Sequence, residues 1–146
     1  MLIRKMTPED VPVAVEIEKA CFSQPWSEKS FLDSISREDT IFLVCEQGAS
    51  VKGYIGMYLS FEEANITNVA VSPEYRKQGF GEQLVLGAKN FATERNIEKI
   101  FLEVRVSNEP AISLYKKMGF ENLGVRKKFY EHPVEDAYIM CCDLVS

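Results

Sequence analysis

The sequence predicts a mixed α/β domain built around one parallel crossover. A β-branched apolar segment at residues 66–71 leads into a glycine-rich loop, a helical pattern at residues 81–95 and an alternating strand pattern at residues 99–106. A strand, helix and strand in this order form a βαβ unit, so the two strands should run parallel. Upstream, strand patterns at residues 40–47 and 51–61 are joined by a short glycine-containing turn, which indicates an antiparallel hairpin.

Composition limits the class of protein. The chain has 146 residues, 46% of them hydrophobic and 27% charged, which suits one globular domain spanning residues 1–146. No apolar run is long enough to cross a bilayer, and the first residues lack the apolar core of a signal peptide, so we expect a cytoplasmic protein without a membrane partner. The net charge of −5 argues against direct nucleic-acid binding, which favours a basic surface.

Cysteine and histidine usage predicts neither disulfides nor a metal site. The four cysteines lack the paired spacing of metal ligands, and adjacent Cys141 and Cys142 would point to opposite faces of a strand. The single histidine, His132, cannot form a metal site by itself and is predicted to lie in a loop. We therefore expect reduced thiols and no metal cofactor.

The N-terminal segment predicts a strand and two helices. Residues 2–6 form the strand, and Thr7 with Pro8 marks a helix start that Pro12 should make irregular. Ser27 is the predicted N-cap of the second helix. The loop between the helices carries large apolar side chains that either line a pocket or pack beneath the helices: Phe22, Pro25 and Trp26.

The loop after residues 66–71 suits a phosphate ligand. Proline ends the strand, and residues 76–81 are basic and glycine-rich. The free N–H groups at the start of the following helix point back at this loop, where they and the glycines can hold a pyrophosphate. The loop is no Walker motif, because no Gly-Lys-Ser/Thr follows, and Leu84 occupies the position of the third dinucleotide-binding glycine.

The C-terminal part predicts a strand, a helix and a final hairpin. Strand 99–106 places Glu103 on the face opposite its aliphatic residues. Asn108 is the predicted N-cap of a helix that ends at Gly119 and carries Tyr115 on its apolar face. The chain then forms two strands separated by a basic, aromatic loop: residues 120–125 and 135–144, with the loop at 126–130.

Two groups of motifs resemble those of a known superfamily. Arg76-x-x-Gly79-x-Gly81, after a strand ending in Ala-Val, is similar to the acetyl-coenzyme A signature of the GNAT N-acetyltransferases. The segment at residues 103–120, EVRVSNEPAISLYKKMGF, resembles the RimI-type ribosomal-protein alanine N-acetyltransferases within that superfamily. Two shorter motifs resemble the same subgroup: Phe22-x-x-Pro25-Trp26-Ser27 and Arg126-x-x-Phe129-Tyr130.

The resemblance covers nearly the whole chain but has two departures. Phe129 stands where relatives usually have a second tyrosine, and Ser23-Gln24 is an insertion ahead of Pro25. The implied fold is a twisted mixed sheet of six or seven strands with helices on both faces. Its central parallel strands splay apart to hold acetyl-coenzyme A.

The resemblance also implies roles for individual residues. Glu103 resembles the general base that takes a proton from the amine, and Tyr115 resembles the acid that protonates the leaving thiolate. The alternatives are a solvated glutamate and a core tyrosine. Asn108 is either an N-cap alone or also a contact for the pantetheine arm. The implied acetyl-coenzyme A contacts are Val69, Ala70, Val71, Arg76, Lys77, Gln78, Gly79, Phe80, Gly81, Asn108 and Tyr115, and the implied substrate contacts are Phe22, Pro25, Trp26 and Tyr130.

The implied activity is acetyl transfer to the N-terminal α-amine of a protein, specifically the N-terminal alanine of a ribosomal protein, by a monomer or weak dimer. Two alternatives remain open. An acetyltransferase for a small free amine, such as a polyamine or amino sugar, would have a closed acidic pocket rather than an open groove. A non-catalytic acyl-coenzyme A binding module would need neither Glu103 nor Tyr115.

Overall fold

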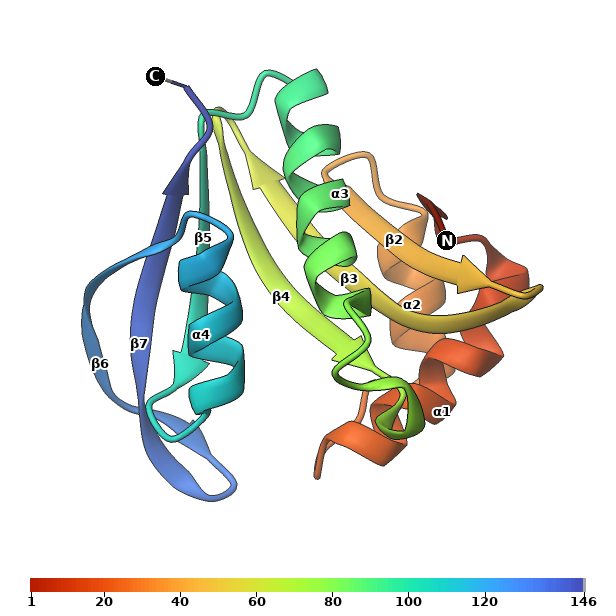
Figure 1. Cartoon of the computed structure of the whole chain (residues 1–146), viewed down its shortest axis with the longest axis horizontal. Coiled ribbons are helices and arrows are strands. Elements are labelled where there is room, and N and C mark those ends of the chain that lie inside the picture. Colours follow the sequence, from red (N-terminus) through yellow and green to blue (C-terminus); the bar gives the residue numbers. More distant parts are fainter. Residues whose placement is uncertain (146) are drawn as a thin grey trace.

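The computed structural model describes residues 1–145, which form a seven-stranded sheet with helices on both faces (Figure 1). The strand order is β1-β2-β3-β4-β5-β7-β6. This architecture confirms the predicted mixed sheet. The strands are β1 (Leu2–Lys5), β2 (Thr40–Gln47), β3 (Ser50–Ser60), β4 (Glu63–Val71), β5 (Lys99–Arg105), β6 (Glu121–Glu131) and β7 (Val134–Asp143), and the α-helices are α1 (Val11–Cys21), α2 (Glu28–Ile35), α3 (Phe80–Glu94) and α4 (Glu109–Lys117).

The start of α1 is irregular, as Pro12 predicted. A 3-10 turn at Pro8–Asp10 precedes the helix, and Pro12 lies in the first turn of α1, where no intrahelical N–H donor is lost. The N-cap of α2 is also confirmed, because the Ser27 side chain accepts a hydrogen bond from the Ser30 N–H at 3.1 Å. No helix within residues 1–145 is long and apolar enough to cross a membrane.

The sheet has a separate hydrophobic core on each face. Helices α3 and α4 cover one core, which includes Leu84, Ile100 and Leu102. Helices α1 and α2 cover the other, which includes Phe31 and Tyr54. The two faces of β5 differ in burial. Ile100, Leu102 and Val104 are buried, as the alternation predicted, while Glu103 on the opposite face is half-buried.

The crossover helix α3 connects β4 to β5, the one parallel pair in the sheet, which confirms the predicted βαβ unit. Pairing covers only four positions, from Glu63 with Lys99 to Ile66 with Leu102. Beyond these residues the strands diverge, and Figure 1 shows a widening space between β4 and β5. The separation of β4 and β5 is therefore present in the backbone pairing itself.

A β-bulge in β4 coincides with the start of this divergence. Ile66 pairs with Met57 of β3 and Asn68 pairs with Gly56, so Thr67 has no partner in the register. The bulge changes which face each side chain joins: Ile66 belongs to the α3 core, whereas Ala70, four residues later, belongs to the α1 core. Bulges commonly re-aim side chains beside functional sites.

The prediction of a loop at residues 126–130 is wrong. These residues lie within β6, where Tyr130 pairs with Glu135 after a register shift that follows Arg126. Strand β6 is at the sheet edge and is largely exposed on both faces. The predicted strand at residues 120–125 is therefore the first half of β6. Because neither face is deeply buried, residues 126–130 have no apolar alternation from which the continuation of the strand could be predicted. His132 lies in the turn between β6 and β7, as predicted.

Candidate active site

The divergence of β4 and β5 leaves backbone groups without sheet partners. The Ser72 N–H donates to the Lys52 carbonyl at 2.8 Å, so Ala70, two residues earlier, also faces β3. By the same alternation, the N–H groups of Val69 and Val71 face away from β3, toward the gap, and the Val71 carbonyl accepts a hydrogen bond from the Cys21 thiol at 3.5 Å. Two of the three predicted β4 amides are thus available to a ligand, and the third belongs to the sheet.

The glycine loop presents a second set of free N–H groups. The first hydrogen bond of α3 runs from the Gln83 N–H to the Gly79 carbonyl at 3.1 Å. The N–H groups of residues 80–82 donate to no backbone acceptor within residues 1–145. The N-terminal end of a 15-residue helix therefore offers donors and a partial positive charge, which fits a pyrophosphate.

Gly79 is required for its backbone conformation. Its φ is +87°, and a Cβ added there would meet no atom within 4 Å. A side chain would therefore be disfavoured by the left-handed backbone rather than by protein crowding. Gly81 differs, because a Cβ there would lie 3.3 Å from Leu114 of α4, so this glycine allows the two helices to approach closely.

The remaining loop side chains are placed differently from one another. Arg76, Lys77 and Gln78 are exposed, and the Arg76 guanidinium donates to the Cys21 sulfur at 3.1 Å. Phe80 is buried in the α3 core, so only its N–H can contact a ligand. The resemblance assigned all four residues to the acetyl-coenzyme A site. In the structure the first three side chains are exposed, whereas that of Phe80 belongs to the core.

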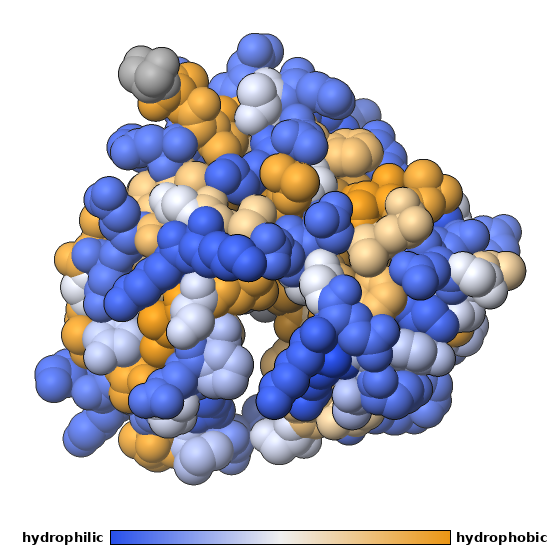
Figure 2. All heavy atoms as spheres, in the orientation of Figure 1, coloured by the Kyte–Doolittle hydropathy of each residue, from blue (hydrophilic) through white to orange (hydrophobic). Residues whose placement is uncertain are grey.

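A cavity of about 410 Å³ opens where β4 and β5 diverge. Figure 2 shows an opening through the molecule between α4 on one side and the loop preceding α3 on the other. The cavity is therefore accessible from more than one direction. Its lining residues are Tyr58, Asn65, Ile66, Thr67, Glu103, Phe129 and Tyr130.

Glu103 is the only carboxylate in this lining. It follows Leu102, the last β5 residue that pairs with β4. Its side chain makes no hydrogen bond or ion pair with residues 1–145, while the nearby Arg105 guanidinium is paired with Glu135 at 3.2 Å. Tyr130 closes the cavity over β5, with its hydroxyl donating to the Glu103 main-chain carbonyl at 3.2 Å. The Glu103 carboxylate is thus unneutralised and faces a cavity.

Tyr115 has a buried ring, as its core alternative predicted, and a hydroxyl without a protein partner within residues 1–145. Its ring packs in the α3–α4 core, with its centroid 5.7 Å from that of Phe120. Within residues 1–145 every fully buried polar side-chain atom has a hydrogen-bond partner, and the Tyr115 hydroxyl has none, so this hydroxyl must reach accessible space. Burial and the proximity of Tyr130 raise the pKa of Tyr115 well above its ordinary value, so the hydroxyl is protonated at neutral pH and can donate.

Asn108 is confirmed as the N-cap of α4. Its side-chain oxygen accepts a hydrogen bond from the Ala111 N–H at 3.3 Å. The amide nitrogen of Asn108 is not used by this cap, so a contact with a ligand is compatible with it.

The aromatic loop before α2 lies outside the cavity lining. Trp26 packs against Phe31 and Phe42, with ring centroids 5.3 and 6.0 Å away, which agrees with the alternative that this loop packs beneath the helices. Phe22 is 43% exposed, and Pro25 is also exposed. Of the four predicted substrate contacts, only Tyr130 lines the cavity.

The sequence reasoning did not identify four residues of this region. Tyr58, Asn65 and Thr67 line the cavity. Glu18 is a buried carboxylate, 2% exposed, that contacts Asn68, the neighbour of Thr67. Glu18 did carry a signal, because it follows the buried residues Val11 and Ala14 at the i, i+3, i+7 spacing of a helix core face. A glutamate at such a position indicates a polar group with a specific partner.

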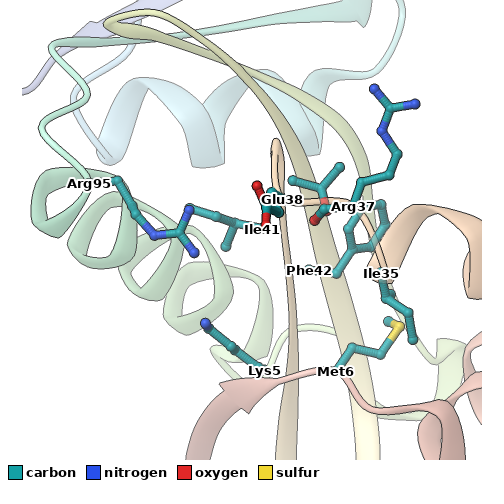
Figure 3. A pocket seen from close by; sticks show the side chains of 9 residues that line it. Lys5, Met6, Ile35, Arg37, Glu38, Ile41, Phe42 and Arg95 are labelled. Atoms are coloured by element: carbon teal, nitrogen blue, oxygen red, sulfur yellow. The ribbon is translucent and has the colours of Figure 1, made fainter.

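A second, smaller cavity of about 120 Å³ lies between β1, the loop after α2 and the end of α3 (Figure 3). Its lining contains three cations, Lys5, Arg37 and Arg95, and one carboxylate, Glu38. Arg37 is already paired with Asp39 at 2.7 Å. None of the residues predicted to bind acetyl-coenzyme A or to catalyse its reaction lies in this lining. Within residues 1–145 no cluster of three or more His, Cys, Asp or Glu residues has the arrangement of a metal site.

The sequence and fold are similar to those of characterised proteins. Residues 11–120 match the model of the acetyltransferase (GNAT) family. A ribosomal protein bS18-alanine N-acetyltransferase from Escherichia coli K12 is 32% identical, over 94% of both chains. A Bacillus subtilis (strain 168) protein with a provisional name of the same kind is 40% identical over 94% of this chain and 92% of its own.

Structural similarity extends over the same length. The crystal structure of the ribosomal-protein-S18-alanine N-acetyltransferase from Escherichia coli superposes with a TM-score of 0.90 at 31% identity. The match covers 99% of this chain and 94% of that one.

Proposed function

The chain belongs to the GNAT acetyltransferase family and is an acetyl-coenzyme A-dependent N-acetyltransferase, and we propose that it acetylates the N-terminal alanine of a ribosomal protein. The observation that carries this proposal is the Glu103 carboxylate at the open mouth of the β4–β5 gap. The names of the relatives from Escherichia coli and Bacillus subtilis support the choice of substrate. The enzyme acts in the cytoplasm as a monomer or weak dimer.

The proposed acetyl-coenzyme A site has two parts. The N–H groups of residues 80–82 and the loop from Arg76 to Gly79 hold the pyrophosphate, and the charges of Arg76 and Lys77 add to the field of α3. The gap-facing groups of Val69 and Val71 hold the acetyl-pantetheine end, with Asn108 beside it. The N–H groups of residues 80–82 fit the ligand because they donate to no backbone acceptor within residues 1–145.

Bound acetyl-coenzyme A supplies an acetyl thioester as the electrophile. The α-amine of a protein has a pKa of roughly 7.7–8, so much of it is protonated at neutral pH and must lose a proton before it can attack. Glu103 accepts this proton, because its carboxylate faces the cavity and has no competing partner. The nitrogen then forms the C–N bond as the C–S bond breaks.

Two further groups assist the proposed transfer. The Tyr115 hydroxyl donates its proton to the departing sulfur, whose thiol pKa is about 8.5 when free. A gap-facing N–H of β4, from Val69 or Val71, donates to the carbonyl oxygen as negative charge develops there. Each donor is held by secondary structure, so little reorganisation accompanies the reaction.

The cavity lining favours a peptide over a small polyamine. A polyamine site would require several carboxylates, whereas this lining contains one, Glu103, together with the rings of Tyr58, Phe129 and Tyr130. A small-amine acetyltransferase remains the competing function.

The deciding experiment measures which amines become acetylated. The protein is incubated with isotopically labelled acetyl-coenzyme A and a ribosomal-protein extract, and labelled N-termini are mapped by mass spectrometry. Spermidine and glucosamine are assayed in parallel. We expect label on an N-terminal alanine. Turnover confined to the small amines would contradict the proposed substrate, and binding of acetyl-coenzyme A without any transfer would favour a binding module.

A further inference from the structure

Glu18 of α1 is a buried carboxylate surrounded by donors rather than by cations. Its Oε2 accepts a hydrogen bond from the main-chain N–H of Trp26 at 2.8 Å. Its Oε1 accepts from the Tyr54 hydroxyl and, at 3.4 Å, from the Asn68 side-chain nitrogen. The ion pairs within residues 1–145 do not include Glu18. Burying a carboxylate without a cation is costly in free energy unless hydrogen-bond donors satisfy its oxygens.

This carboxylate sets the direction of a hydrogen-bond chain. Burial and the bond to Glu18 raise the pKa of Tyr54 far above its ordinary value, so Tyr54 remains a donor. Because a carboxylate only accepts, Asn68 must turn its NH₂ group toward Glu18. The Asn68 oxygen therefore faces Thr67, whose Oγ1 lies 2.7 Å away and donates its single hydrogen there, since the other acceptor, the Gly56 carbonyl, is farther away at 3.5 Å.

The chain ends at the wall of the active-site cavity. Thr67 lines this cavity together with Glu103. The two residues are the first beyond Ile66 and Leu102, the last parallel pair of β4 and β5, so they lie on opposite sides of the opening gap. With its hydrogen committed to Asn68, the Thr67 hydroxyl has lone pairs left to accept a hydrogen bond from a ligand.

We propose that the Thr67 hydroxyl accepts a hydrogen bond from the attacking amine, and that Glu18 is a positioning residue that keeps it an acceptor through Asn68. This inference rests on the proposed function, because it requires an amine in the cavity. Thr67 takes no proton in the reaction. With Glu103 and Thr67 holding its N–H groups from opposite sides, the nitrogen keeps its lone pair directed toward the gap where the thioester binds.

Two Thr67 variants test the contact. Thr67→Val removes the hydroxyl and keeps the branched shape, whereas Thr67→Ser retains the hydroxyl. For a peptide with N-terminal alanine, we expect Thr67→Val to lower kcat/KM about tenfold, mainly by raising KM, as loss of one hydrogen bond predicts. Thr67→Ser should retain most of the activity. Both variants should bind acetyl-coenzyme A with unchanged Kd by calorimetry.

A double-mutant cycle tests the role of Glu18. In Glu18→Gln the new NH₂ group faces Asn68, which should turn over and donate to Thr67. This bond occupies a lone pair of the hydroxyl and releases its hydrogen from Asn68, so the hydroxyl becomes a poorer acceptor for the amine. We expect about a tenfold loss of kcat/KM in Glu18→Gln and no further loss when Thr67→Val is added. Asn68→Ala, which removes the connecting residue, should also be non-additive with Thr67→Val and provides a second route if Glu18→Gln folds poorly.

Asp10→Asn is the matched control. Asp10 is a buried carboxylate like Glu18, but it forms an ion pair with Arg4 at 2.7 Å and does not line the cavity. The substitution should reduce stability and leave kcat/KM unchanged at neutral pH. Wild-type kcat/KM in Thr67→Val would overturn the amine contact. Losses that multiply in the double variant would overturn the role of Glu18 and leave it a structural residue. A wild-type enzyme that acetylates no protein N-terminus would instead overturn the proposed function, and this inference with it.

Discussion

The two ends of the β4–β5 pair differ in whether their backbone groups are hydrogen-bonded within the sheet. At the paired end, from Glu63 with Lys99 to Ile66 with Leu102, the backbone groups bond to each other and Ile100 is completely buried. At the diverged end the gap-facing groups of Val69 and Val71 have no sheet partner, and Glu103 faces a cavity of about 410 Å³. One end stabilises the fold, and the other leaves donors for a ligand.

The difference follows from the bulge at Thr67. An extra residue in β4 bends the strand and changes the direction of its later side chains. Unpaired backbone N–H groups are unfavourable when buried, so a fold retains them only where a ligand or water can satisfy them. Variants at the two ends should therefore separate activity from stability.

The largest effect is expected at the diverged end. Glu103→Gln should lower kcat/KM by about 10² to 10⁴, because it removes general-base catalysis and keeps the side-chain volume. The pH–rate profile should change, and the rise that remains should follow deprotonation of the substrate α-amine, whose pKa is roughly 7.7–8. Acetyl-coenzyme A affinity by calorimetry and the free energy of unfolding should be nearly unchanged. A pH–rate profile identical to that of the wild type would exclude Glu103 as the base.

Ile100→Ala is the counterpart at the paired end. Removing a completely buried isoleucine side chain should lower the free energy of unfolding by about 2–5 kcal/mol, as measured by urea denaturation. The KM for the peptide should change little at temperatures where the variant is folded. A large change in KM without loss of stability would mean that the two ends are not separable.

Tyr115→Phe should have an intermediate effect. Loss of the proton donor should reduce kcat about 10²-fold, at the low end of general-acid contributions. The melting temperature should stay close to that of the wild type, because the hydroxyl has no hydrogen-bond partner within residues 1–145 and the ring packing is kept. Full activity in steady-state assays would leave Tyr115 with a core role only.

Gly79→Val should weaken acetyl-coenzyme A binding by about tenfold, because a left-handed conformation costs a residue with a side chain roughly 1–2 kcal/mol. Gly48→Val is a matched control. Gly48 also has a positive φ, +63°, and open space around it, but it lies in the β2–β3 turn. Calorimetry should show weaker binding only for the Gly79 variant. Equal affinities in both variants would remove the loop from the pyrophosphate site.

The smallest effect concerns stability in acid. The hydrogen bond from Arg4 holds the pKa of Asp10 below its usual range, so Asp10 stabilises the fold fully above its unfolded-state pKa of about 3.9. This contribution is lost as the pH falls through the lower pKa of the folded state. In urea unfolding between about pH 2.5 and 7, Asp10→Asn should show a weaker acid dependence than the wild type. An identical dependence would contradict the assigned pKa direction.

Local sequence patterns predicted most of the elements because their signals lie within short windows. The alternation that buries Ile100 and leaves Glu103 on the other face of β5 is visible in seven residues. The Asn108 cap and the Gly79 turn each depend on a few backbone angles. The glycine loop, the βαβ unit and the position of Glu103 could therefore be derived before the structure.

Tertiary structure alone decided where β4 and β5 separate, which residue forms the bulge and which polar groups become buried. Glu18 and Asn68 are 50 positions apart in the chain, and their contact depends on α1 packing across the sheet. The first half of β6 was predicted as a strand, whereas residues 126–130 were not, because their side chains are largely exposed on both faces. Short-range preferences set the conformation of each element, whereas register and burial are set by contacts between distant segments. The site lies where those long-range contacts end.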